Sequence, residues 1–69
     1  MIRINVHNTA TVIFYLPESV IQYLRDNEIK IIGEVKGELI EIDKTENPEN
    51  LIEILASQNI QASIVNFCN

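Results

Sequence analysis

Few side chains in this sequence belong to the types that usually perform chemistry. Cys68 and His7 are the only residues of their kinds, so a nucleophile–base pair would have to join these two, and a His/Cys metal site would lack ligands. Cys68 is the second-last residue, where chains commonly fray. His7 stands among turn-forming residues. We therefore expect an incidental thiol and a solvated turn histidine in place of a catalytic pair.

Carboxylates are the second group with chemical potential. Glu34, Glu38, Glu41 and Asp43 follow one another at short spacing, and paired acids can bind Mg²⁺ or Ca²⁺ or transfer protons. However, no DxDxDG-like calcium loop and no second acidic cluster accompany them. We interpret them as solvated strand residues, and predict no bound metal, no cofactor and no enzymatic activity.

Binding of nucleotides or nucleic acid is also disfavoured. The two predicted helix starts, Pro17-Glu18 and Pro48-Glu49, place an acid where a phosphate would bind. Tyr15 and Phe67 could stack on bases from an open sheet, but such surfaces need Lys or Arg around the aromatic rings. The neighbours here are mostly acids, so we expect no direct contact with nucleic acid.

Size and composition indicate one small domain spanning residues 1–69. Hydrophobic residues make up 46% of the chain, and ten acids against five bases give a net charge of −5. A chain this short is marginally stable alone, and one Cys cannot form an internal disulfide, so we expect a homo-oligomer. The acidic balance and the lack of a long apolar run disfavour a membrane. No signal peptide is visible, so the expected location is cytoplasmic.

Residues 29–43, IKIIGEVKGELIEID, have the pattern of a β-hairpin that turns at Lys36-Gly37. A two-residue loop there pairs Val35 with Glu38, Gly33 with Ile40 and Ile31 with Ile42. The other face then pairs Glu34 with Leu39, Ile32 with Glu41 and Lys30 with Asp43. We expect a hairpin without a bulge, in which Gly33 leaves room for Ile40.

Two more strands precede this hairpin. Residues 2–6 alternate between apolar and polar, and residues 11–16, TVIFYL, are apolar on both sides, as is typical of a central strand. A loop at residues 8–10 would pair Ile2 with Leu16, Ile4 with Phe14 and Val6 with Val12. This register predicts that Ile13 and Tyr15 lie on the opposite face.

Two helices and a last strand complete the chain. Pro17 is predicted to open a helix that stops at Asn27, and Asn47-Pro48-Glu49 to start a second helix that ends near residues 58–59. A strand follows from residue 60 or 61 to residue 67. The helices match at an offset of 31 residues, with Leu24 aligned to Leu55. Either an internal duplication or convergence on good helix starts explains the match.

The predicted order is ββαββαβ, an α+β fold with two helices on one face of an antiparallel sheet. From about residue 11 it reads βαββαβ, the ferredoxin-like arrangement, preceded by an extra N-terminal strand. The face under the helices would hold Ile4, Val6, Val12, Phe14, Leu16, Ile31, Val35, Ile40, Ile42, Ala62 and Ile64. The opposite face would hold Arg3, Asn5, Ile13, Tyr15, Lys30, Ile32, Glu34, Leu39, Glu41, Val65 and Phe67.

The second face is too apolar for a fully solvated sheet, which favours an interaction surface. Our leading hypothesis is a non-catalytic protein-interaction or regulatory module that acts through this face or a sheet edge. We expect it to form a homodimer or higher oligomer and also to bind another protein. The alternatives are an acidic inhibitor or antitoxin-like protein that neutralises a basic or nucleic-acid-binding partner, and a small-ligand sensor domain. The predicted interaction surface consists of Ile13, Tyr15, Ile32, Glu34, Leu39, Glu41, Val65 and Phe67.

Overall fold

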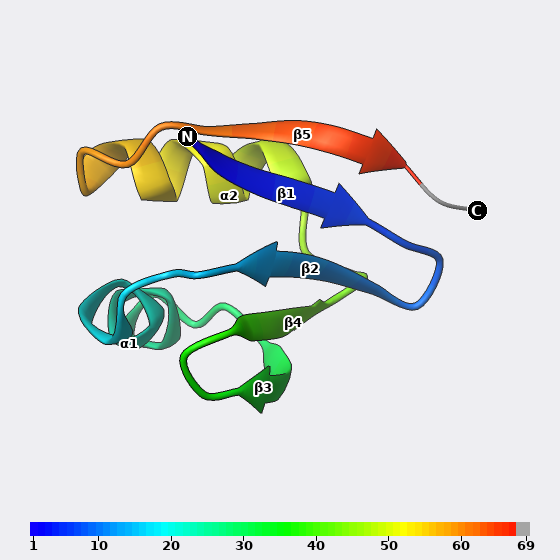
Figure 1. The fold of residues 1–69 in the computed structure, drawn as a ribbon, viewed down its shortest axis with the longest axis horizontal. Coiled ribbons are helices and arrows are strands. Elements are labelled where there is room, and N and C mark those ends of the chain that lie inside the picture. The colour runs from blue at the N-terminus through cyan, green and yellow to red at the C-terminus, as the bar shows by residue number, and fades with distance from the viewer. Residues whose placement is uncertain (68–69) are drawn as a thin grey trace.

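The computed structural model describes the backbone of residues 1–67 and the side chains of residues 1–65. This part of the chain is an α+β domain in which a five-stranded sheet carries two helices on one face (Figure 1). The elements are β1 (Ile2–Val6), β2 (Ala10–Phe14), α1 (Glu18–Asp26), β3 (Ile31–Val35), β4 (Leu39–Asp43), α2 (Pro48–Ser57) and β5 (Ala62–Phe67). The order predicted from the sequence, ββαββαβ, is confirmed.

The strands lie in the order β3-β4-β2-β1-β5, so β3 and β5 form the two edges. All neighbouring pairs are antiparallel except β1 and β5, which run parallel. Figure 1 looks onto the strands, with α2 behind β1 and β5 and α1 next to the end of β2. The ferredoxin-like arrangement is not confirmed, because β1 lies between β2 and β5.

The core lies between the sheet and the two helices. Each helix buries one stripe of apolar side chains spaced three to four residues apart, as an amphipathic helix should. These stripes pack on the β-branched residues of the central strands. The core cluster contains Ile4, Ile13, Leu16, Val20, Ile21, Leu24, Ile29, Ile40, Ile42, Leu51 and Leu55.

The two helices end in the same way. After α1, Glu28 has φ +63°, and the Ile29 N–H bonds to the Leu24 carbonyl at 3.1 Å. After α2, Asn59 has φ +62°, and the Ile60 N–H bonds to the Leu55 carbonyl at 3.0 Å. Both are Schellman motifs with a left-handed residue at C′. The 31-residue correspondence therefore extends to the backbone of the helix ends.

The predicted pairing of β1 with β2 is wrong by one residue. The His7 N–H bonds to the Ala10 carbonyl at 2.9 Å, so the connection is shorter than expected and Ile4 lies opposite Ile13. A shift of one residue moves every side chain of a strand to the other face. Ile13 is therefore fully buried under the helices, and Phe14 lies on the open face.

The predicted β3–β4 hairpin is correct at its base and wrong at its tip. Ile31 lies opposite Ile42 as expected, but the register then shifts, and Gly33 lies opposite Glu41. The turn closes through a 2.9 Å hydrogen bond from the Glu38 N–H to the Val35 carbonyl, with Gly37 at φ +78°. That positive φ at the third turn position identifies a type II turn, which requires glycine there.

The bulge changes the faces of the residues that follow it. Glu34 lies opposite the buried Ile40 and reaches the helix layer, where Arg25 of α1 donates to its carboxylate at 2.7 Å. Val35 pairs with Leu39 and is exposed on the other side. The predictions of Glu34 on the open face and of Val35 under the helices are thus wrong, because a bulge inserts one extra residue into the strand.

Candidate functional site

The open face is the side of the sheet opposite the helices. Residues paired across neighbouring strands share a face, so the register identifies one row that crosses all five strands. Val35 pairs with Leu39, Leu39 with Phe14, and Arg3 with Ser63. Phe14 follows Ile13, which pairs with Ile4, so the row passes from Phe14 to Arg3. The row is apolar on three strands and polar on the last two.

Tyr15 is the most exposed aromatic residue of this face, with 70% of its surface accessible. Its φ is +60°, which is rare for a bulky residue and interrupts the strand alternation. The backbone is held there by a 2.7 Å hydrogen bond from the Tyr15 N–H to the Glu38 carbonyl. As a result the ring lies beside Phe14, with centroids 5.9 Å apart and planes inclined at 44°.

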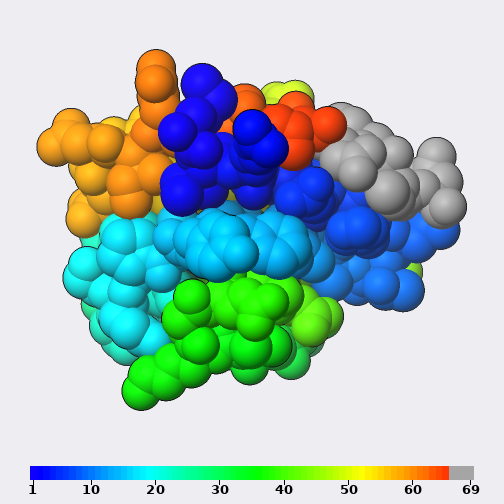
Figure 2. All heavy atoms as spheres, viewed as in Figure 1, coloured from blue at the N-terminus to red at the C-terminus, as the bar shows by residue number. Residues whose placement is uncertain are grey.

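The two aromatic rings border a hollow of about 600 Å³ between β2, β1 and β5. Figure 2 shows this face, where atoms of β2 and the segment after it cross the centre between β1 and the β3–β4 hairpin. The residues around the hollow are Met1, Ile2, Arg3, Asn5, Phe14, Tyr15 and Val65. Among them Arg3 is the only charged side chain.

Charge is unevenly distributed along the chain and therefore across the sheet. All ten acidic residues lie within residues 18–53. The strands β2, β1 and β5 contain no acidic residue, and residues 54–69 contain no charged residue at all. These three strands are neighbours. One half of the open face is thus nearly free of charge in a chain whose net charge is −5.

The structure brings together only part of the predicted interaction surface. Tyr15, Leu39, Glu41 and Val65 lie on the open face. Ile32 occupies the bulge of the edge strand β3 and is exposed.

The other three predicted residues do not join this group. Ile13 is buried in the core, and Glu34 lies on the helix side. The side chain of Phe67 lies outside the described residues.

Phe14 is the main residue that the sequence prediction missed, because it was placed under the helices. The polar pair Asn8-Thr9 could have served as a two-residue loop, and that loop would have given the observed register. Arg3 and Asn5 were predicted on the correct face but were not included in the site.

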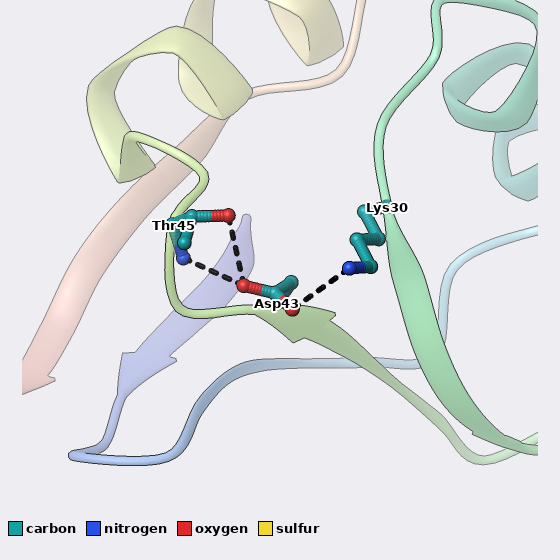
Figure 3. Close-up of polar contacts among 3 residues, drawn as sticks. All are labelled: Lys30, Asp43 and Thr45. Carbon is teal, nitrogen blue, oxygen red and sulfur yellow. Dashed lines mark hydrogen bonds and ion pairs between the residues drawn. The ribbon is translucent and has the colours of Figure 1, made fainter.

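Asp43 is the one carboxylate whose pKa is clearly shifted. The Thr45 N–H and hydroxyl donate to Asp43 Oδ1 at 2.9 and 2.8 Å, and Lys30 Nζ lies 3.7 Å from Oδ2 (Figure 3). The backbone hydrogen bond from Thr45, its hydroxyl and the Lys30 charge lower the pKa of Asp43. The contacts close the turn after β4, so this carboxylate has a structural role.

The remaining chemistry-bearing residues are dispersed. Glu34 pairs with Arg25, whereas Glu41 lies near Gly33 on the open face. Within residues 1–67, no three His, Cys, Asp or Glu side chains come together. Cys68 lies outside the described residues. Neither of the two helices described is long and apolar enough to cross a membrane.

Comparisons of the chain with protein-family models, with curated proteins and with solved structures found no match. The assignment of a function therefore rests on the open face itself.

Proposed function

We propose that this chain is a non-catalytic protein-interaction module that binds a partner protein through the open face and that also self-associates. The partner would contribute an apolar side chain to the hollow beside Phe14 and Tyr15, and a carboxylate to Arg3. The observation that carries the proposal is the apolar row on the sheet face opposite the helices, in which Val35 is exposed and Leu39 and Phe14 are half-buried.

The composition of the open face supports binding to a protein. Val35, Leu39 and Phe14 lie next to one another across three strands, and exposed Val65 lines the hollow. Contiguous apolar patches rimmed by polar side chains mark interaction sites more often than single exposed residues do. Aromatic residues are enriched at the centres of such interfaces.

The backbone of Tyr15 supports a preformed site. A left-handed conformation costs an L-residue roughly 1–2 kcal/mol, and residues held in this way cluster at ligand-contacting positions. Relaxation of Tyr15 to an ordinary strand conformation would restore alternation and direct its ring to the helix side. The observed conformation instead keeps two aromatic rings together at the rim of the hollow.

The charge distribution favours a partner that carries an acidic group. Arg3 has the only charged side chain among the described residues that line the hollow, so an acidic group on the partner would find a cation there. The alternative of an acidic inhibitor would use the helices, the β3–β4 hairpin and the segments that join them, where all the acids lie. The two hypotheses therefore predict binding through different surfaces and opposite responses to removal of Arg3.

The test compares the two tyrosines of the chain, since Tyr23 lies on α1 in the helix layer, with its hydroxyl 3.3 Å from Ser57 Oγ. Tagged wild type, Tyr15→Ala and Tyr23→Ala are used to capture partners from cells that naturally produce the protein, after circular dichroism shows that each variant is folded. We expect one stoichiometric partner with wild type and Tyr23→Ala, and its loss with Tyr15→Ala.

Arg3→Glu provides the electrostatic arm of this test. It should weaken binding of the captured partner, because close charge pairs contribute to affinity and specificity at interfaces. Capture that survives both Tyr15→Ala and Arg3→Glu would contradict the proposal. Capture that strengthens with Arg3→Glu would favour the acidic-inhibitor alternative.

A further inference from the structure

We infer that two copies of this chain join through the outer edge of β5, so that their sheets form one continuous ten-stranded sheet. The inference rests on the self-association that is part of the proposed function. It names the surface that a second copy occupies, which is the outer backbone edge of β5. The partner of the proposed function instead binds side chains of the open face, and the two surfaces adjoin at Ser63 and Val65.

The β5 edge has free backbone groups within the described residues. The Ile2 N–H bonds to the Gln61 carbonyl at 2.9 Å, so the N–H and C=O of Gln61 and, two residues on, of Ser63 point toward β1. Backbone groups of successive strand residues point to opposite sides. The N–H and C=O of Ala62 and Ile64 therefore point away from β1, and within residues 1–67 no other strand follows β5 in the sheet order.

The two edges of the sheet differ in their protection. On β3, the bulge at Ile32 precedes Glu34, and Lys30 and Lys36 flank the strand. Bulges and charges, lysine in particular, are the usual means of preventing edge pairing. The Ala62–Phe67 strand has no charged residue and no proline. Its one irregularity follows Ile64, which leaves residues 62–64 regular.

Charge identifies the occupant as a second copy. A chain of net charge −5 repels itself wherever acids meet. The neighbouring strands β2, β1 and β5 have no acid, so two sheets can meet along this edge without like charges on the strands themselves. The acids on this side of the molecule are Glu49 and Glu53 of α2, which packs on β5. A two-fold axis at Ser63 would pair Ala62 of each copy with Ile64 of the other, making about four backbone hydrogen bonds.

A matched pair of valines tests the inference. Val65 on β5 is 50% exposed and Val35 on β3 is 49% exposed, so Val65→Lys and Val35→Lys place the same charge beside opposite edges. Sedimentation velocity over a concentration series should give a dimer for wild type and for Val35→Lys. For Val65→Lys, the dissociation constant should rise about tenfold or more, because the lysine would be desolvated in the new interface.

Amide hydrogen exchange of the wild type gives a readout that does not depend on a substitution. The Ala62 and Ile64 amides should be protected at concentrations where the dimer forms and should exchange faster on dilution. Fast exchange of both amides in a dimeric sample would overturn the edge inference and leave the open-face proposal intact.

Two further outcomes would overturn it. One is a Val65→Lys chain that dimerises as well as wild type. If Tyr15→Ala were also monomeric, dimerisation would be assigned to the open face. The other is a wild type that is monomeric at all concentrations but protects these amides when a foreign extended peptide binds, which would assign the edge to another protein. A wild type that remains monomeric would also remove self-association from the proposed function, whereas its open-face binding is tested separately by Tyr15→Ala.

Discussion

Replacing Glu28 by glycine should stabilise the protein, because Glu28 holds a left-handed conformation at the end of α1 with φ +63°. That conformation costs an L-residue about 1–2 kcal/mol. Glycine avoids this cost, but its greater freedom in the unfolded chain lowers the free energy of unfolding by about 0.5–1 kcal/mol. Removing a carboxylate next to the negative end of a helix raises the free energy of unfolding by about 0.3 kcal/mol. The expected net gain in the free energy of unfolding is about 1 kcal/mol.

The measurement is urea unfolding followed by circular dichroism, with thermal unfolding as a second readout. A gain of this size should raise Tm by about 4–8 °C in a domain of this length. The urea m-value should stay constant, since the surface exposed on unfolding does not change.

Two controls separate the backbone effect from the charge. Glu28→Gln removes the carboxylate but keeps the left-handed strain, so it should change stability by less than about 0.5 kcal/mol. Asn59→Gly acts at the equivalent position of α2, where φ is +62°, and should be close to neutral because asparagine tolerates this conformation. A Glu28→Gly variant that is less stable than wild type, or no more stable than Glu28→Gln, would contradict a backbone strain at Glu28.

Three more predictions follow from contacts in the fold. Asn47→Ala should cost about 1 kcal/mol in chemical denaturation, because it removes the 2.9 Å cap between Asn47 Oδ1 and the Glu49 N–H; a neutral result would contradict the capping role. Asp43 has a lowered pKa in the folded state, so its stabilisation is complete above its ordinary pKa of about 3.9 and is lost as pH falls through the folded value. Asp43→Asn should therefore reduce the dependence of stability on pH in that acid range, and an unchanged pH profile would argue against it. Ile13→Ala should cost about 2–5 kcal/mol and Phe14→Ala clearly less, since Ile13 is fully buried and Phe14 is on the open face; the reverse order would favour the register expected from the sequence.

The two helices and the order of helices and strands along the chain could be predicted, because capping residues and hydrophobic patterns indicate the same elements. Asn47 before Pro48 specifies a helix start, and the amphipathic stripes specify which helix face is buried. In strands whose apolar and polar residues alternate, such as β1 and β4, the buried face was also predicted correctly.

The register of β2 could not be predicted because its sequence is apolar on both sides. Alternation gives no preference between Ile13 and Phe14 as the buried residue, and the length of the turn at Asn8-Thr9 decides. The bulge in β3 was missed for a related reason, since Gly33 fits both a regular strand and a bulged one. Each error places side chains on the wrong face of the sheet. Ile13 and Glu34 therefore do not lie on the open face as predicted, and Phe14 lies there instead.

The most direct test of the open face as the interaction surface is site-specific photo-cross-linking. A photoreactive phenylalanine analogue would replace Tyr15 in one variant and Tyr23 in another, each produced in cells that naturally make the protein. We predict a discrete, saturable adduct with one partner protein from position 15 and none from position 23 on α1. Adducts from position 23 alone, or the same adducts from both positions, would contradict the assignment of function to the open face.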